Sequence, residues 1–323
     1  MSSHTLQARV HTLRHEAEGI VSVGFRPASE GVAFPPFSAG SHIDLHLPNG
    51  LMRSYSLCNP TSDSGHYVVG VQFDRASRGG SRYVHEQLRA GQVIEISAPR
   101  NNFALREDAG KSVLVSGGIG ITPLWCMLQH LVALGKPVEL IYCARSRQEA
   151  AFLEPIAALA GRVPLTWHFD SEHGGPPDLT ALLANRGADS DYYCCGPAPM
   201  LDAFEKACER LSYANWHIER FAAVAMEPSA AASGSFEVVC EKSGRTVQVP
   251  TGASILDVLI DAGLNPDHSC REGVCGACET AVLGFDGGLE HLDSVLTRKE
   301  HEAGKTMMIC VSRCTGRRLV LDI

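Results

Sequence analysis

The stretch Cys270-Arg-Glu-Gly-Val-Cys275-Gly-Ala-Cys278 has C-x4-C-x2-C spacing, and one further cysteine follows in a later apolar run. This is the plant-type spacing of thiolate ligands around a [2Fe–2S] cluster. Gly273 and Gly276 allow the backbone amides of the loop to turn toward the sulfurs. A zinc site is the alternative, but zinc loops usually carry two C-x2-C pairs and this chain has one. The spacing therefore predicts an iron–sulfur cluster whose ligands are Cys270, Cys275, Cys278 and Cys310.

The composition limits what kind of protein surrounds this loop. A chain of 323 residues is long enough for two or three domains, and 45% hydrophobic with 20% charged residues is typical of a globular protein. A net charge of −8 disfavours a nucleic-acid partner. No apolar run reaches the ~20 residues of a membrane span, and no signal peptide is recognisable. Twelve scattered cysteines do not resemble a disulfide framework, so we expect a cytoplasmic protein.

The pattern of apolar and turn residues divides the chain into four segments. Residues 1–106 carry short alternating apolar runs broken by turn residues and predict an antiparallel β-barrel domain. Residues 107–226 alternate buried strands with helices, including one expected over 123–134, and predict a parallel α/β domain. Residues 227–234 are small and polar and predict a linker. Residues 235–323 combine a hairpin, a helix and a terminal strand around the cysteines and predict a third domain.

Two segments of the first domain carry groups suited to a phosphate-bearing ring cofactor. Arg53-Ser-Tyr-Ser56 ends an expected strand: arginine can fork onto a phosphate, and tyrosine and serine can reach an isoalloxazine ring. The segment 75–81 supplies Arg75, Arg78, glycine amides and a hydroxyl at the start of an expected helix. Taken alone, the first could be an ordinary barrel surface and the second a plain polar turn.

Two segments of the second domain are placed where nucleotides bind. Gly117-Gly-Ile-Gly-Ile-Thr-Pro123 follows a buried strand and opens a helix; it departs from G-x-G-x-x-G but still exposes amides to a ligand. Cys194-Cys-Gly-Pro197 ends the last strand of the expected sheet, and ligands lie at the carboxyl ends of strands in open α/β sheets. Both thiols could simply be buried, although we expect one beside a nicotinamide.

Taken in order, these motifs resemble the phthalate dioxygenase reductase family of the ferredoxin–NADP reductase superfamily, a plan that vanillate O-demethylase reductases share. The resemblance covers the whole chain. It implies a β-barrel flavin domain, a parallel α/β nucleotide-binding domain and a C-terminal plant-type ferredoxin domain of β-grasp fold. It also implies a monomeric enzyme that passes electrons from NADH to FMN, to the [2Fe–2S] cluster and on to a terminal Rieske-type oxygenase.

The resemblance assigns roles by position. FMN contacts are implied for Arg53, Ser54, Tyr55, Ser56, Gln72, Gly79, Gly80, Ser81, Thr122 and Phe221. NAD contacts are implied for Gly117, Gly118, Arg145, Asp170, Cys195, Gly196 and Pro197. Participation in the reaction itself is implied for Phe221, which covers the isoalloxazine where nicotinamide docks, and for Cys195 and Ser56. Core packing is the alternative role of Phe221.

Two departures from the family pattern bear on the sites. Cys314 is a second candidate for the fourth cluster ligand, but Cys310 follows an apolar strand and matches the family position. After the second α/β strand the family often has an acidic residue, whereas this chain has Arg145 and Arg147, which could accept a 2′-phosphate. Asp170 would instead accept ribose hydroxyls and repel a phosphate, so NADH is the expected coenzyme.

Two other functions are compatible with these motifs. The chain could be a flavin and iron–sulfur electron-transfer subunit of another redox complex, or a redox sensor that binds a partner through its ferredoxin domain. The helix expected over 255–262 and the strand over 318–321 complete a whole ferredoxin fold, which disfavours the first. The fourteen histidines carry no catalytic signal, because hydride transfer needs no general base, and we expect most of them at the surface.

Overall fold

The computed structural model describes residues 5–63, 65–74, 79–222 and 234–323 and divides into two compact units. The larger unit comprises residues 3–221, and the smaller unit contains residues 222–323. The expected boundary between residues 106 and 107 therefore lies within one unit. Most of the expected linker lies outside the described residues, so the domain limits stay predictions.

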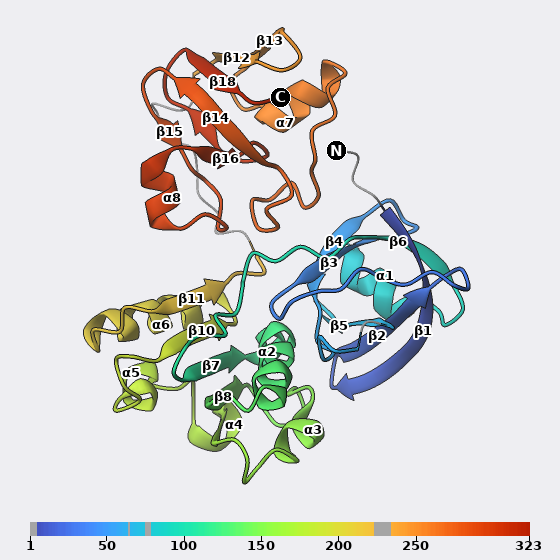
Figure 1. Cartoon of the computed structure of the whole chain (residues 1–323), viewed down its shortest axis with the longest axis vertical. Helices are drawn as coiled ribbons and strands as arrows, with labels where there is room; N and C mark the ends of the chain where they lie inside the picture. Colours follow the sequence, from blue (N-terminus) through green and yellow to red (C-terminus); the bar gives the residue numbers. More distant parts are fainter. Residues whose placement is uncertain (1–4, 64, 75–78, 223–233) are drawn as a thin grey trace. The chain divides into compact units, whose positions relative to one another are not determined.

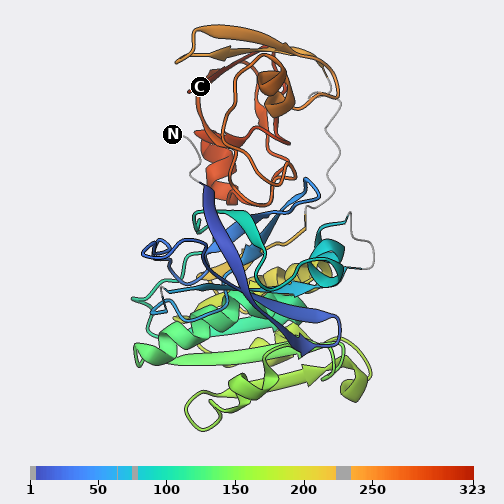
Figure 2. The same ribbon diagram turned by 90° about the vertical axis from the view of Figure 1, so that its right-hand side faces the viewer.

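The first part of the larger unit is an antiparallel barrel, in which β1 is the long dark-blue strand of Figures 1 and 2. The strand order is β4-β3-β6-β1-β2-β5, and an antiparallel bridge between Leu57 and Val69 joins the chain after β4 to β5. Alternate residues such as Val10, Val23 and Ile43 are fully buried, as expected for strands with one face in a core. The elements are β1 (Thr5–Ala17), β2 (Ile20–Pro27), β3 (His42–His46), β4 (Met52–Ser56), β5 (Tyr67–Gln72), α1 (Gly80–Glu86) and β6 (Val93–Ser97).

The second part of the larger unit is a parallel sheet of order β11-β10-β7-β8-β9. The chain order reverses direction between β7 and β10, and such switch points are where open α/β sheets bind ligands. Its strands are β7 (Ser112–Gly117), β8 (Val138–Ala144), β9 (Leu165–Phe169), β10 (Asp191–Cys195) and β11 (Trp216–Glu219). Its helices are η1 (Gly118–Gly120), α2 (Ile121–Ala133), α3 (Leu153–Ala157), α4 (Asp170–His173), α5 (Leu179–Leu183) and α6 (Ala198–Arg210).

Helix α2 joins the barrel to the parallel sheet. It begins at Ile121, two residues before the expected start, because a proline is tolerated in the first turn. Gln129 of α2 donates to the carbonyl of Cys58 at 2.9 Å, and His130 meets Thr61 at 2.8 Å. Leu124 and Leu128 belong to the same buried cluster as the barrel interior. This shared core explains why the two parts form one compact unit.

The smaller unit is a mixed sheet of order β13-β12-β18-β14-β16, with a two-stranded sheet of β15 and β17. Strands β12 and β18 run parallel, and their buried side chains pack with α7 in one core. The elements are β12 (Phe236–Cys240), β13 (Arg245–Val249), α7 (Ile255–Asp261), β14 (Glu279–Phe285), β15 (Leu289–Glu290), α8 (Arg298–Ala303), β16 (Thr306–Met308), β17 (Arg313–Cys314) and β18 (Arg318–Leu321). The expected terminal strand is found at the expected residues.

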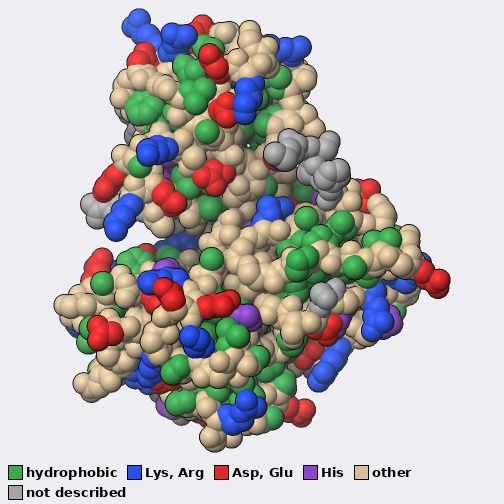
Figure 3. All heavy atoms as spheres, in the orientation of Figure 1, with side chains coloured by type: hydrophobic (Ala, Val, Ile, Leu, Met, Phe, Trp, Pro, Cys, Tyr) green, Lys and Arg blue, Asp and Glu red, His purple; other side chains and the backbone are tan. Residues whose placement is uncertain are grey.

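Charged side chains of both signs are interspersed over the face drawn in Figure 3. In the part of the chain that the structure describes, no helix is both long enough and apolar enough to cross a bilayer.

Candidate cofactor sites

The carboxyl ends of β7 and β10 approach each other closely enough to require glycine. A Cβ on Gly120 would lie 2.1 Å from the carbonyl oxygen of Cys195, and a Cβ on Gly117 would lie 3.2 Å from the Cα of Gly196. Gly118 adopts a φ of 54°, in the left-handed region that favours glycine. The two predicted nucleotide segments are therefore adjacent, and they form a backbone-lined edge at the switch point of the sheet.

Arg53 and Gly80 come together on the barrel. A Cβ on Gly80 would lie 2.7 Å from Cγ and 2.9 Å from Nε of Arg53, so only glycine lets the arginine stem lie against the start of α1. Gly79 precedes the helix with a φ of 105°. This arrangement fits a phosphate held between a guanidinium and helix amides. The expected contributions of Arg75 and Arg78 lie outside the described residues.

The other residues expected near the flavin differ in burial and in the hydrogen bonds that they make. Burial raises the pKa of Tyr55 to about 12 against the opposing charge of Arg53, so its phenol stays neutral. The Ser54 hydroxyl donates to Asp44 of β3 at 2.5 Å, so its side chain could act toward a ligand only as an acceptor. Gln72 is exposed at the end of β5, and the Ser81 hydroxyl accepts from the amide of Asp74 at 3.1 Å.

Thr122 and Phe221 differ in burial, because the first side chain is buried and the second is exposed. Thr122 is 1% exposed and its methyl group packs against the barrel, because a Cβ on Gly70 would lie 2.6 Å from Thr122 Cγ2. Its hydroxyl donates to the Ile119 carbonyl. Phe221 is 42% exposed, which excludes core packing within the described residues of the larger unit and leaves its ring available to a ligand.

Glu219 is a site residue that the sequence did not suggest. It ends β11, where the Cys195 thiol donates to its carboxylate at 4.0 Å and the Ser56 hydroxyl bonds to it. Burial raises the pKa of Glu219 to about 8, and Ser56 opposes the shift. Burial also raises the pKa of the Cys195 thiol, with a further contribution from Glu219. The structure thus brings together two of the three predicted reaction residues, Ser56 and Cys195, through a carboxyl group whose pKa is raised by burial.

The carboxyl ends of β8 and β9 hold the residues expected to select the coenzyme. The Ser171 amide donates to the Arg145 carbonyl at 2.9 Å, so the two strand ends are bonded through their backbones. Arg147 does not project freely: it donates to both carboxylate oxygens of Glu172, at 2.6 and 3.3 Å, and stacks on Phe169. Asp170 is partly exposed beside this pair. Glu172 therefore neutralises one of the two arginines that could attract a 2′-phosphate.

The cluster cysteines form two pairs. The side chains of Cys270 and Cys275 are hydrogen-bonded to each other, and so are those of Cys278 and Cys310. None of the four cysteines forms a disulfide. Backbone amides of Cys270 and Glu272 donate to loop sulfurs at 3.4 and 3.3 Å. The Cys275 side chain and the amides of Val274, Glu272 and Cys275 lower the pKa of Cys270 to about 6 despite its burial. Two thiol pairs surrounded by inward amides fit a cluster in which each iron takes two thiolates.

Cys314 is engaged elsewhere. Its buried thiol donates to the carbonyls of Asp286 and Arg318, at 3.5 and 3.7 Å, within the β15–β17 region. This placement supports Cys310 as the fourth ligand.

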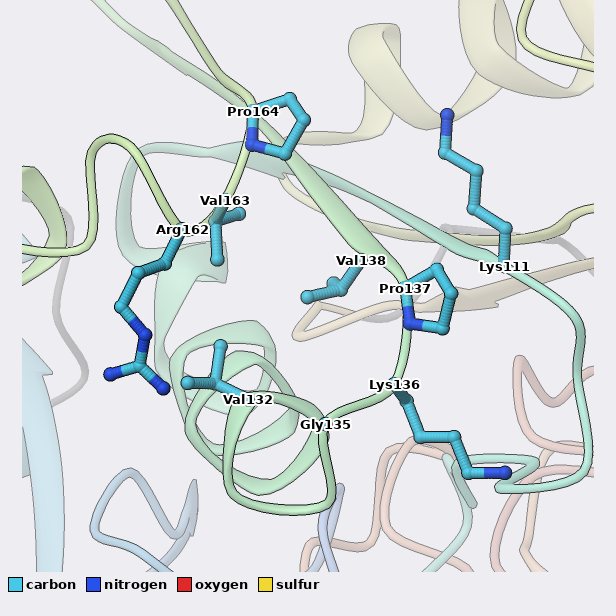
Figure 4. Close-up of a pocket in the computed structure, with 9 residues that line it drawn as sticks. All are labelled: Lys111, Val132, Gly135, Lys136, Pro137, Val138, Arg162, Val163 and Pro164. Carbon is cyan, nitrogen blue, oxygen red and sulfur yellow. The ribbon is translucent and has the colours of Figure 1, made fainter.

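A separate hollow lies at the opposite edge of the parallel sheet, where β8 and β9 begin (Figure 4). Val132, Val138 and Val163 form its apolar lining, and Lys136 and Arg162 stand at its rim. Lys111, the third basic residue, is bonded to Glu139 at 2.9 Å. Because ligands of such sheets bind at the carboxyl ends of the strands, this hollow is not the nucleotide site.

Comparisons with known proteins agree with these sites. Residues 238–315 match the 2Fe-2S iron-sulfur cluster binding domain, and residues 114–206 match the oxidoreductase NAD-binding domain. The chain is 46% identical over 317 residues to the phenoxybenzoate dioxygenase subunit beta of Ectopseudomonas oleovorans, covering 98% of this chain and 96% of that protein.

A solved structure decides the family. Phthalate dioxygenase reductase, described as modular for electron transfer from pyridine nucleotides to [2Fe–2S], matches with a TM-score of 0.70 and 33% identity over 99% of this chain and 98% of that chain. The chain belongs to the phthalate dioxygenase reductase family. The family, the three-part fold and the electron-transfer oxidoreductase class predicted from the sequence are therefore confirmed.

The same architecture also occurs within a longer protein. An intact type IV self-sufficient cytochrome P450 monooxygenase matches with a TM-score of 0.88 and 37% identity over 99% of this chain. The match covers 41% of that chain, so a region similar to this chain occupies less than half of that longer polypeptide.

Proposed function

We propose that this chain is the reductase component of a two-component Rieske-type oxygenase or demethylase system, taking electrons from NADH and delivering them to a separate oxygenase. The observation that carries the proposal is the edge where Ser56 of the barrel meets Cys195 and Glu219 of the parallel sheet. Flavin-side and nucleotide-side residues share that edge within one compact unit, and the same chain holds the cluster cysteines.

In this proposal the chain's residues bind and orient the cofactors. FMN, when bound, accepts two electrons as a hydride and releases them singly, which matches a one-electron cluster to a two-electron donor. Arg53 and the amides after Gly79 would hold the FMN phosphate, and Phe221 would lie against its ring. Ser56, Cys195 and Glu219 would present hydrogen-bonding groups to the flavin and the nicotinamide. Asp170 receives the ribose of NADH.

The loop from Cys270 to Cys278, together with Cys310, holds the [2Fe–2S] cluster as the exit for single electrons. Inward-facing amides at Glu272 and Cys270 stabilise its negative charge. The oxygenase is a separate protein in this proposal, and the chain acts in the cytoplasm as a monomer.

The test uses two electron acceptors and one variant. Wild type should reduce both ferricyanide and cytochrome c with NADH, whereas Cys275→Ser should keep FMN and ferricyanide reduction but lose most cytochrome c reduction. The wild type should also support substrate-dependent oxygen uptake when mixed with a Rieske-type oxygenase. Acid-released FAD instead of FMN would overturn the cofactor assignment, and turnover too slow to supply an oxygenase would favour a redox sensor.

A further inference from the structure

The ferredoxin unit contains a buried group of metal-ligating side chains apart from the cluster cysteines. His291 directly follows β15, Asp293 lies in the next loop, and His301 lies in the last turn of α8. One donor atom from each residue lies within 4.8 Å of the other two. The side chains of Asp293 and His291 are 0% and 5% exposed. We propose that His291, Asp293 and His301 form a binding site for a divalent transition-metal ion, with Zn²⁺ as its ligand.

The distances between donor atoms suit a tetrahedral ion. Nε2 of His301 lies 3.4 Å from Oδ1 of Asp293, and Nδ1 of His291 lies 3.8 Å from the same oxygen. Ligands bound at 2.0–2.1 Å with tetrahedral angles are separated by roughly 3.3 Å. A turn of the His301 ring would therefore bring the three donors onto one ion, and a water molecule would complete the coordination as in other three-ligand zinc sites.

Unpaired buried nitrogens give an independent indication of a ligand. Among the described residues, neither ring nitrogen of His291 nor Nε2 of His301 makes a hydrogen bond of acceptable geometry, although Oδ1 of Asp293 lies nearby, and all three nitrogens are buried. A buried polar atom without a hydrogen bond destabilises the folded state unless a ligand satisfies it. Two neutral imidazoles and one carboxylate form a donor set that suits zinc better than calcium or magnesium.

The carboxylate of Asp293 is prepared to act as a ligand. The carboxylate is buried and is held by the backbone amides of Leu296 and Val295. The two amides donate to Oδ2, at 2.8 and 3.1 Å, while Oδ1 faces the two histidines and accepts from the Ser312 hydroxyl at 3.5 Å. Backbone donors thus fix the orientation of the carboxylate, as second-shell groups do in metal sites.

Metal binding requires one ring to turn. The His291 and His301 rings are stacked with centroids 4.4 Å apart and an interplanar angle of 11°, so their lone pairs run parallel instead of converging. The His301 side chain is 29% exposed and has room to rotate, whereas His291 is enclosed. Binding therefore exchanges a ring stack for two coordinate bonds, with His301 as the moving ligand.

The site lies directly behind the cluster loop. The Ser294 amide donates to the Gly273 carbonyl at 2.9 Å, and a Cβ on Gly273 would lie 3.1 Å from the Cα of Asp293. An ion held by Asp293 would therefore tie β15 and α8 to the loop that carries Cys270 and Cys275. Zinc should make the unit that holds the cluster more resistant to heating, because a ligand that binds only the folded state stabilises it.

The experiment measures zinc and iron together in the full, cluster-loaded chain. Wild type, His301→Ala, Asp293→Asn and the surface control His11→Ala are dialysed against micromolar Zn²⁺, and bound metals are counted by mass spectrometry. Wild type and His11→Ala should hold about one zinc more per chain than His301→Ala and Asp293→Asn, with equal iron in all four. Zinc should also raise the temperature at which cluster absorbance is lost, in the first two proteins only.

Equal zinc in wild type and His301→Ala, or zinc gained only as iron is lost, would overturn the proposal. The first result would mean that the three residues hold no zinc. The second would mean that zinc had replaced iron at the cluster cysteines. Should Asp293→Asn fail to fold, His301→Ala still decides the question, because its side chain is the most exposed of the three.

Discussion

At the scale of single residues, the barrel and the parallel sheet each contribute groups whose properties depend on their surroundings. Arg53 keeps its position because Gly80 leaves room for its stem. Glu219 is the clearest case: its carboxyl group is bonded to Ser56 and Cys195, and burial raises its pKa to about 8. Neither effect is encoded by the residue type alone, and each can be tested by one substitution.

Arg53→Ala should weaken FMN binding. Loss of a charge-assisted phosphate contact costs ~1.5–3 kcal/mol, which is roughly a tenfold to hundredfold loss of affinity. The purified variant should be pale and regain its yellow colour at high FMN, as measured by fluorescence titration. Arg89→Ala, an exposed arginine of the same barrel, serves as the control and should bind FMN as wild type does; equal affinities for all three proteins would remove Arg53 from the site.

Glu219 should make stability depend on pH. The folded-state pKa of Glu219 is about 8, above the ordinary value of 4.5, so between these pH values the folded protein binds one more proton than the unfolded chain. The contribution of Glu219 to the free energy of unfolding is therefore greatest below pH 4.5 and is lost as pH rises through 8. The melting temperature of FMN-loaded wild type should therefore fall, relative to Glu219→Gln, between pH 5 and about pH 9. The surface variant Glu209→Gln should track wild type. Parallel pH profiles for wild type and Glu219→Gln would show that the carboxyl group ionises normally.

At the scale of elements, loops at strand ends determine which side chains can meet. The cluster loop pairs Cys270 with Cys275, whereas Cys310, at the end of the segment after β16, pairs with Cys278. Cys314 lies in β17 and points to carbonyls of another loop. The same principle applies at β8 and β9, where Glu172 of α4 reaches back to Arg147.

Cys310→Ser should lose the cluster, whereas Cys314→Ser should keep it, because only the first removes a thiol paired with Cys278. Iron content and the visible spectrum of the purified variants measure the outcome, and FMN content provides the internal control. A brown, iron-loaded Cys310→Ser together with a colourless Cys314→Ser would reverse the ligand assignment.

Glu172→Gln should weaken the preference for NADH. The substitution removes the carboxylate that neutralises Arg147, so a 2′-phosphate meets one more free cation. The ratio of kcat/KM for NADH to that for NADPH should fall by roughly twofold to fivefold, because charges at exposed sites are screened. Asp170→Ser should reduce the same ratio by removing the ribose acceptor. If the NADH to NADPH ratio of kcat/KM were unchanged in both variants, the 2′ group of the coenzyme would not bind beside Glu172 and Asp170.

At the scale of the whole molecule, one compact unit handles the two-electron chemistry and a second compact unit holds the one-electron centre. The barrel and the parallel sheet share a core through α2, so the flavin and nucleotide residues keep a fixed geometry. The ferredoxin unit has a core of its own.

Loss of the cluster should therefore leave the larger unit folded and active. Cys275→Ser should reduce ferricyanide with NADH at a rate within about twofold of wild type, since its substitution lies outside the core that positions Ser56 and Cys195. Stopped-flow absorbance of the flavin measures the first step directly. A large loss of flavin reduction in this variant would mean that the two units do not fold independently.

The sequence by itself determined the fold, the family and the cluster loop. Cysteines at C-x4-C-x2-C spacing lie within one short loop, and strand–helix alternation reflects local periodicity, so both are visible without a structure. Only the tertiary structure placed Glu219 against Ser56, paired Glu172 with Arg147, and gathered His291, Asp293 and His301. These contacts join residues from different strand ends and helices, and sheet order and side-chain packing determine which ends meet. Local spacing does not carry that information.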